Sequence, residues 1–184
     1  MAIGFAFRDI LQNYLAGILL LLANPFAIGD QIIVNNFEGT VENIEVRATT
    51  ITTYDGRRVV IPNAVLYTQS VTVNTAYDKR RVQYEFDVDY NTNLEKAQKV
   101  MLAATESAEG VMREPSPDAL VVAVTSNGVT IRVRWWIGPP RKIDQLDTQD
   151  NVLIAIKRAL VANGIQQPVP SQEIILENAR DGKQ

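Results

Sequence analysis

The chain has 184 residues and a net charge of −3, and 46% of its residues are hydrophobic, enough for one ordinary domain or two small ones. It contains no cysteine and no histidine. Disulfides, thiolate chemistry and nearly every zinc site are therefore excluded, and the commonest general acid–base residue is missing. The acidic balance also argues against a duplex-binding protein, because such proteins carry a strong basic excess.

The first expected element is a helix over residues 3–23, where apolar residues recur at helical spacing. Asn24-Pro25 ends it, because proline disfavours helix in the residue before it. The most apolar run, Leu15 to Ala23, is too short for a bilayer span, which takes roughly 20 apolar residues. The wider stretch is polar enough to suit a helix that faces a pore or lies at an interface. From the pattern alone, an amphipathic helix packed on a soluble core is the alternative. The apolar positions are Phe7, Ile10, Leu11, Tyr14, Leu15 and Ile18.

Residues 30–75 predict short strands joined by turns. Asp55-Gly56 is the strongest hairpin signal, Asn35-Asn36 and Glu38-Gly39 are typical of turns, and Pro62-Asn63 ends a strand. Strands this short at this spacing favour a small β-barrel. The β-branched runs lie at Gln31–Val34, Thr40–Ile44, Thr49–Tyr54, Arg57–Ile61 and Val71–Val73.

Residues 80–180 differ, and the boundary falls near Asn74 to Lys79. The first strand alternates apolar and polar residues, which places its aromatic residues Tyr84, Phe86 and Tyr90 in the core. The order that follows is βαββαβ, the ferredoxin-like plan. Its parts are a helix with Leu94, Ala97, Val100, Met101 and Ala104 on one face, a Glu114–Pro117 loop, strands at Leu120–Val124 and Val129–Ile137, a helix from about Asp144 carrying Leu146, Val152, Leu153, Ile156 and Leu160 and capped by Asn163-Gly164, and a last strand at Ile174–Leu176.

Enzyme chemistry finds little support. No glycine-rich phosphate loop, nucleophile–histidine pair or metal-ligand cluster occurs, so we expect no catalytic residue, no metal and no cofactor. Asp87 and Asp89 share a strand face, as solvent-facing acids do in most sheets. The alternative function is a soluble oligomeric RNA-binding module, for which Trp136 is the candidate stacking platform. Inward-facing aromatic residues argue against it.

Several motifs resemble the small-conductance mechanosensitive channel (MscS) family, in order and along essentially the whole chain. Residues 6–17 resemble the end of the pore-lining helix, and residues 24–32 resemble the Pro-Phe-x-x-Gly-Asp junction into the β domain. Residues 39–49 follow the family's pattern. Asp55-Gly56 and Val60-Ile61-Pro62-Asn63 match its turn and strand end. Gly164-Ile165 with Pro168-Val169-Pro170 resembles its approach to the chamber exit.

The resemblance implies an α+β fold in three parts. These are the pore-helix end with an interfacial helix over 1–28, a small Sm-like β-barrel domain over 29–76, and a ferredoxin-like α/β domain over 77–184. It implies part of a tension-gated, weakly selective channel that releases ions and small osmolytes on hypoosmotic stress. The expected assembly is a homoheptamer in the inner membrane, in contact with lipid through the N-terminal helix and through further membrane helices upstream. Most of this chain lies on the cytoplasmic side, and no nucleic-acid partner is expected.

The same resemblance assigns site residues by position. Phe5 lies at or beside a hydrophobic constriction, which gates by losing its water. Gly39 serves a turn, and Arg47 is a salt-bridge partner within or between subunits. The full assignment is Ala2, Phe5, Ala6 and Asp9 for the pore and gate; Gly4 and Gly17 for helix packing or a bend; Pro25, Phe26, Gly29 and Asp30 for the domain junction; and Gly39, Arg47, Asp55, Gly56, Pro62 and Asn63 for the β-domain structure.

Overall fold

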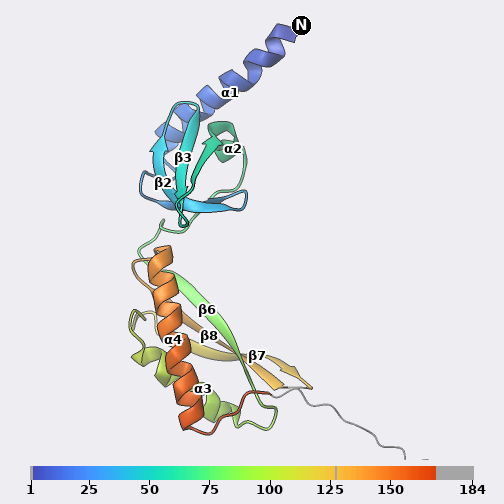
Figure 1. The fold of residues 1–184 in the computed structure, drawn as a ribbon, viewed down its shortest axis with the longest axis vertical. Coiled ribbons are helices and arrows are strands. Elements are labelled where there is room, and N and C mark those ends of the chain that lie inside the picture. The colour runs from blue at the N-terminus through green and yellow to red at the C-terminus, as the bar shows by residue number, and fades with distance from the viewer. Residues whose placement is uncertain (1, 127, 169–184) are drawn as a thin grey trace, which may run out of the picture. The chain divides into compact units, whose positions relative to one another are not determined.

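The structure, a computed structural model, describes residues 2–126 and 128–168, with side chains from Arg8 onward. The chain divides into two compact units, whose main parts are residues 1–82 and residues 83–135 (Figure 1). Among the described helices, none combines the length and apolar character that crossing a bilayer requires. The α+β class expected from the sequence is confirmed.

The first unit contains a helix followed by one antiparallel sheet and a short second helix. Its strands are ordered β4-β3-β2-β1-β5. β5 is only two residues long and pairs with β1, so the described strands leave β4 and β5 as open edges and do not close the expected barrel. The elements are α1 (Ala2–Ala23), β1 (Gln31–Val34), β2 (Phe37–Ile44), β3 (Ala48–Thr53), β4 (Arg58–Pro62), α2 (Asn63–Thr68) and β5 (Thr72–Val73).

A turn at Asn35-Asn36 sets the register between β1 and β2. Asn35 and Asn36 have φ angles of 47° and 66°, as a two-residue hairpin turn between β1 and β2 requires. Gly39 lies inside β2 opposite Ile32 and Thr53, so the expectation of a turn at Glu38-Gly39 is wrong. A side chain at residue 39 would come within 2.5 Å of the Thr52 carbonyl oxygen, which explains the glycine inside a strand.

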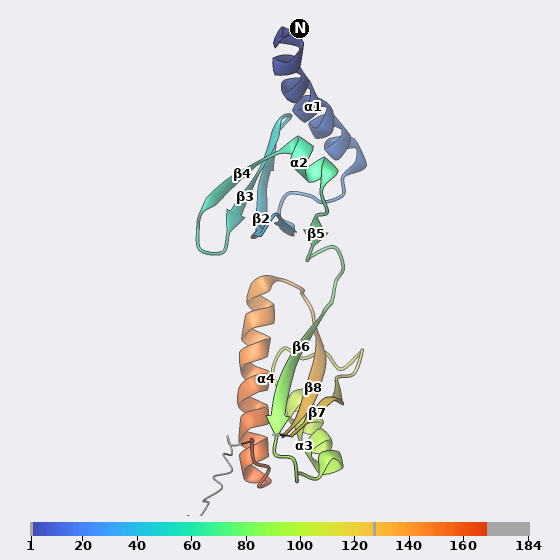
Figure 2. The same cartoon turned by 90° about the vertical axis from the view of Figure 1, so that its right-hand side faces the viewer.

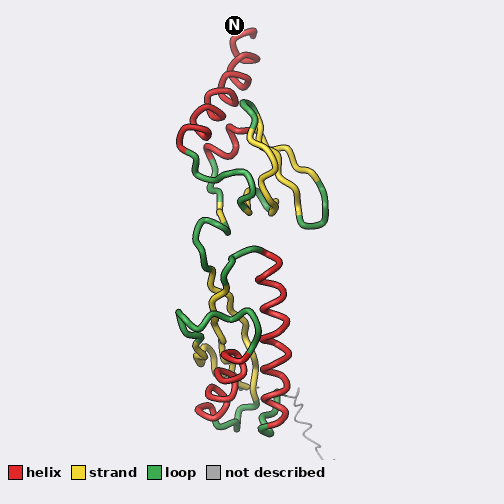
Figure 3. Tube along the Cα trace, turned by 90° about the vertical axis from the view of Figure 1, so that its left-hand side faces the viewer, coloured by secondary structure: helices red, strands yellow, loops and turns green. Residues whose placement is uncertain are grey.

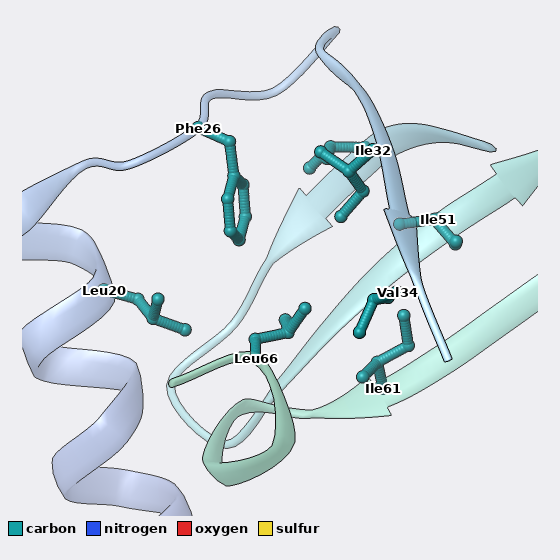
Figure 4. Packing of buried hydrophobic residues seen from close by; sticks show 8 residues of the cluster. Leu20, Phe26, Ile32, Val34, Ile51, Ile61 and Leu66 are labelled. Carbon is teal, nitrogen blue, oxygen red and sulfur yellow. The ribbon is translucent and has the colours of Figure 1, made fainter. Parts of the chain in front are cut away.

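A single apolar cluster holds α1, the sheet and α2 together. Leu20 from α1, Phe26 from the following loop and Leu66 from α2 point toward one another above the strands (Figure 4). Beneath them lie Ile32, Val34, Val41, Ile51 and Ile61, all buried. The expected helix end at Asn24-Pro25 is confirmed, and it lets Phe26 turn back into this cluster.

The described part of the second unit carries a three-stranded sheet of order β6-β8-β7, in which β7 and β8 are antiparallel, with two helices on one face (Figure 2). This is the expected βαββα order, and the last expected strand, Ile174–Leu176, falls outside the described residues. The loop over residues 114–117 is irregular as expected, and Figure 3 shows the helices, strands and loops of the chain in separate colours. The elements are β6 (Arg80–Val88), α3 (Leu94–Ser107), β7 (Asp118–Thr125), β8 (Gly128–Ile137) and α4 (Lys142–Ala162).

Strand β8 lies at the centre of this sheet. Its odd-numbered residues from Val129 to Ile137 are all buried, as the alternation predicts. Its even-numbered residues lie on the other face, where Arg132 pairs with Glu85 at 2.6 Å and Arg134 with Asp118 at 2.6 Å. One face of the sheet is therefore a core and the other a charged surface.

The end of α4 follows its sequence signal. Gly164 has a φ of +67°, and the amides of Gly164 and Ile165 donate to the carbonyls of Val161 and Leu160. This pair of bonds is the Schellman motif that a glycine at this position favours.

Three expected core residues are exposed instead. Tyr84 is 40% exposed on β6, which is an outer strand among the described strands, although its ring lies 5.1 Å from that of buried Phe86. Tyr90 is 59% exposed because β6 ends at Val88 and the alternation ends with it. Leu146 is 50% exposed on the outward face of α4, where Thr148 takes the buried position.

Candidate functional site

The contact of α1 with the sheet is the candidate site, and it uses the small residues of the helix. Ala16, Gly17 and Leu20 are buried. The apolar positions that periodicity singled out face outward, so the interpretation of that face as packed on this chain's own core is wrong. The exposed members are Ile10, Leu11, Tyr14, Leu15 and Ile18, and they are joined by Leu21 and Leu22.

Gly17 touches the backbone of the loop between β2 and β3. A Cβ placed on it would lie 1.9 Å from the carbonyl oxygen of Val46 and 2.6 Å from Nδ2 of Asn63. Both distances are far inside van der Waals contact, so no residue with a side chain fits without a shift of the helix or the loop. The sequence left a bend or close packing open for Gly17, and the structure places it at a close contact.

Asn63 holds that loop in place. Its side chain is fully buried, and Nδ2 donates to the carbonyls of Glu45 at 2.7 Å and Val46 at 3.0 Å. Its Oδ1 accepts from Thr49 Oγ1 at 2.9 Å. With these three bonds the amide aims the Val46 carbonyl at α1, and a buried amide left without them would be strongly destabilising.

Asn13 makes a second link, from α1 to the start of α2. Its Oδ1 accepts from the amide of Ala64 at 3.0 Å, while its Nδ2 donates to the Asp9 carbonyl one turn earlier at 2.8 Å. The first amides of a helix have no partner within it. Asn13 therefore satisfies one for α2, and the two helices are joined directly.

The junction after α1 is organised by Asp30. Its carboxylate accepts from the Ala27 amide at 2.8 Å and from Thr75 Oγ1 at 2.7 Å, and Thr75 Oγ1 accepts from the Gln31 amide in turn. Gly29, with a φ of +96°, makes the turn that this arrangement needs. The loop that follows α1 is thus tied to the segment that follows β5. Of the other junction residues, Pro25 is exposed and Phe26 is buried.

An open groove of about 640 Å³ lies between α1 and the β3–β4 side of the sheet. Ile10 and Tyr14 form part of its apolar lining, and Asp9, Arg47 and Arg58 bring charges of both signs. Arg58 pairs with Glu42 at 3.2 Å. Arg47 is exposed and forms no salt bridge within the part of the chain that the structure describes.

The Asp55-Gly56 hairpin is built as the sequence predicts, between β3 and β4. Gly56 has a φ of +83°, and Asp55 accepts from Thr53 Oγ1 and pairs with Arg57 at 2.8 Å. The hydrogen bond from Thr53, followed by the charge of Arg57, holds the pKa of the Asp55 carboxyl below its usual range. This hairpin lies at the far end of the strands from the α1 contact, so it shapes the sheet and does not enter the site.

The pore residues assigned by resemblance all lie in α1. Ala2, Gly4, Phe5 and Ala6 are helical, and their side chains are outside the described part. Asp9 is exposed at the edge of the groove. Of the β-domain residues, the structure brings Asn63 to Gly17, whereas Pro62 ends β4 and lines the groove.

Sequence reasoning missed three parts of this site. Helix α2 follows Pro62 directly, where only a strand end was expected. Asn13 and Thr49 were not singled out, and Asn63 was assigned a structural role at a strand end. An asparagine in mid-helix is a weak signal, because such a residue favours a cap or a partner outside the helix.

Comparison with known proteins gives a consistent result. The family model for the mechanosensitive ion channel β-domain matches residues 9–75, and the model for the MscS C-terminal domain matches residues 82–166. These two successive matches take up most of the chain. They give no support to the RNA-binding alternative.

Individual relatives agree. An uncharacterized MscS family protein of Archaeoglobus fulgidus is 30% identical over 97% of this chain and 62% of its own length. The small-conductance mechanosensitive channel MscMJ of Methanocaldococcus jannaschii is 29% identical over 96% of this chain and 51% of its own length. The chain thus spans between half and two thirds of these relatives.

Among solved structures, the closed state of Helicobacter pylori MscS matches with a TM-score of 0.87 at 24% identity, over 96% of this chain and 69% of that one. That similarity shows the fold. Together with the two domain matches and the relatives, it leads to one conclusion: this chain belongs to the MscS family of mechanosensitive channels.

Proposed function

We propose that this chain forms the lower pore and the cytoplasmic chamber of a tension-gated channel subunit in the inner membrane. The observation that carries the proposal is α1, which presents large apolar side chains outward while it is fixed to the sheet through Gly17 and Asn13. A helix with an uncovered apolar face suits contact with lipid or with neighbouring helices.

The proposed subunits form a homo-oligomeric ring, a heptamer by the family resemblance, that conducts ions and small osmolytes. The division into a pore-helix end over 1–28, a β domain over 29–76 and an α/β domain over 77–184 belongs to this proposal. The charged sheet face with Glu85, Arg132 and Arg134 supports a chamber wall, because such a surface favours contact with water. No chemical step is involved, so the proposed protein is not an enzyme.

We propose that the channel opens because its open and closed states occupy different areas of membrane. The open state occupies more membrane than the closed one, so tension shifts the population toward it. The close contact of Gly17 with the Val46 carbonyl fixes the position of α1 on the sheet, so the folded sheet resists a movement of the helix.

Phe5 is proposed at the constriction. A ring of apolar side chains empties a narrow pore of water, and ions do not cross a dry pore. Gly4 and Ala6 on either side are small, so neighbouring helices can approach closely around it.

The test is patch recording against a pressure ramp on membranes that contain the natural protein of which this chain is a part or the whole. Wild type should open under tension, and Phe5→Ser should open at lower tension because the pore stays wet. Tyr77→Ser is the control, since it removes a highly exposed side chain that lies outside α1 and should leave the threshold nearly unchanged. Absence of tension-evoked current in the wild type would overturn the proposed function. An unchanged threshold in Phe5→Ser would move the constriction elsewhere.

A further inference from the structure

The start of α4 is bonded to the sheet that packs against α1. Residues 136–150 belong to the same compact unit as that sheet, so this contact lies within one unit. The Lys142 amide donates to Oε1 of Gln31, the first residue of β1, at 2.8 Å. The first amides of a helix have no partner within it, and here a strand residue 111 positions away supplies one. The bond therefore joins two elements that are far apart along the chain.

Glu38 in β2 makes a second contact with α4. One of its carboxylate oxygens lies 3.5 Å from Lys142 Nζ, and the other accepts from Asn74 Nδ2 at 3.0 Å. Burial and the Glu38 carboxylate raise the pKa of Tyr54 to about 12, so the Tyr54 hydroxyl stays protonated and donates to the same carboxylate. Three segments thus meet at one side chain: α4, the residues after β5 and the turn after β3.

The Glu38–Lys142 pair is better shielded from water than the other salt bridges among the described residues. Its two side chains are 25% and 27% exposed, whereas each of the other pairs has a partner that is at least 44% exposed. Exposed ion pairs contribute little, because water and salt screen them. A shielded carboxylate is more sensitive to the loss of a partner. This pair is therefore the one best suited to hold two elements together.

Strand β2 connects this pair to the α1 contact. Glu38 lies near the beginning of the strand, and the loop with Val46 follows the end of the strand at Ile44. Gly17 of α1 packs against that loop. Because β2 is paired with β1 on one side and with β3 on the other, it is held along its length, and a displacement at one end is passed to the other.

We propose that Glu38 is a positioning residue for gating, which ties the sheet that contacts α1 to the start of α4 through the Glu38–Lys142 pair in the closed channel. Tension that moves α1 then has to move the sheet against this tie. The tie stabilises the closed state, and breaking it shifts the population toward the open state. The inference rests on the proposed function and adds to it a residue that the family resemblance did not assign.

The test is patch recording against a pressure ramp on the protein used for the gating test above. Lys142→Met removes the charge but keeps the backbone amide that bonds to Gln31. It should raise the ratio of open to closed channels at a fixed tension about fivefold or more, because each subunit loses one shielded ion pair. Arg141→Met is the matched control. The partner of Arg141 is Asp144, three residues along the chain, so that pair does not reach the sheet and its loss should leave the ratio unchanged.

An exchange of charges separates this role from a simple loss of stability. Glu38→Lys and Lys142→Glu alone place like charges together, so each should open at lower tension. The combined variant restores an attractive pair and should return the threshold toward that of the wild type. Asn74 and Tyr54 both carry donors and acceptors, so they fit either charge at residue 38. A combined variant that reaches the membrane in normal amount and still opens as early as the single variants would overturn the proposal.

A second set of variants decides the question if the exchanged single variants do not reach the membrane. Glu38→Gln and Lys142→Met each remove the ion pair with little change of shape. Their combination should lower the threshold no further than Lys142→Met alone, because both changes remove the same pair. Thresholds that fall by the sum of the two single effects would show that the residues act independently, against the proposal.

The wild-type recording separates this inference from the proposed function. Tension-evoked current in the wild type, with Lys142→Met indistinguishable from Arg141→Met, would reject the role of Glu38 and keep the channel. A Lys142→Met protein that opens only at higher tension would place the pair in the open state, which also rejects the proposal. No tension-evoked current in the wild type would reject both.

Discussion

The two units hold their helices by different means. In the α/β unit, β8 and α4 both contribute large apolar side chains to the core, and Trp135, Val152 and Ile156 are all fully buried. In the first unit, α1 meets the sheet through Gly17 and the amide of Asn63. In an apolar core, the stability lost on shortening a side chain grows with the volume of the cavity left behind. The α1 contact depends on the absent side chain of Gly17 and on one buried amide, so adding or removing a few atoms there should change its stability. Such a contact suits a helix whose position is set by the β domain.

The largest expected effect lies in the apolar core. Trp135→Ala should lower the free energy of unfolding by about 3–5 kcal/mol, because it leaves a cavity at the centre of the sheet. Trp136→Ala is the matched control, since Trp136 lies on the other face of the same strand and is only half-buried beside Lys79. Thermal and denaturant unfolding of the chain measure both. Equal losses would show that the two faces of β8 do not differ as core and surface.

The next largest loss of stability is expected where α1 contacts the loop held by Asn63. Asn63→Ala should lower the free energy of unfolding by about 2–4 kcal/mol, because the Thr49 hydroxyl and the two carbonyls lose their partner in a buried place. Asn43→Ala is the control, since that asparagine is exposed and should change stability by less than about 0.5 kcal/mol. Combining Asn63→Ala with Thr49→Val should give less than the sum of the two losses, because they share one hydrogen bond.

A smaller change in the free energy of unfolding is expected at Gly17, with a sign opposite to the usual effect of replacing a helix glycine by alanine. Replacing a glycine by alanine inside an exposed helix stabilises it by about 1 kcal/mol. Gly17→Ala should instead destabilise by about 1–3 kcal/mol, because the new Cβ meets the Val46 carbonyl oxygen. Ile18→Ala next to it, at an exposed position, should have the smaller effect on unfolding. A stabilised Gly17→Ala protein would mean that the helix does not sit against this loop.

The smallest effect is electrostatic and lies at the start of α4. Arg141 donates to both carboxylate oxygens of Asp144, at 2.6 and 2.9 Å, and these bonds hold the pKa of that carboxyl below its usual 3.8. A depressed pKa contributes stability above pH 3.8 that is lost as the pH falls through the folded-state pKa. Asp144→Asn should therefore lower the melting temperature slightly at neutral pH and should not lower it once the carboxyl is protonated. A difference that persists unchanged in acid would point to helix capping as its source.

Much of the α/β unit could be predicted from the sequence. The alternation from Val129 to Ile137 placed every core residue of β8 correctly, and Asn163-Gly164 marked the end of α4. These signals are local, because the period of two and the glycine cap are properties of the strand and the helix themselves. Tyr84 was assigned to the core because alternation cannot tell an outer strand from a central one.

The first unit was predictable in its strands but not in its site. The Asp55-Gly56 hairpin and the stop at Pro25 were predicted correctly, since turn chemistry acts over a few residues. The barrel was not, because closure depends on whether β4 and β5 meet, and these strands are separated by α2. What covers the apolar face of α1 was left open for a similar reason, since periodicity identifies an apolar face without saying what covers it.

The sequence by itself determined most of the element order, the hairpin turns at Asn35-Asn36 and Asp55-Gly56, the core of β8 and the family, because these depend on residue type at short spacing and on motifs in a fixed order. Only the tertiary structure decided that Gly17 lies under the Val46 carbonyl and that Asn63 holds that carbonyl in place. It also decided that β7 is an outer strand among those described, with Val121, Val122 and Val124 partly exposed. Each of these depends on which distant segments meet, and a contact across 29 or 46 positions between residues 17, 46 and 63 leaves no periodic trace in the chain.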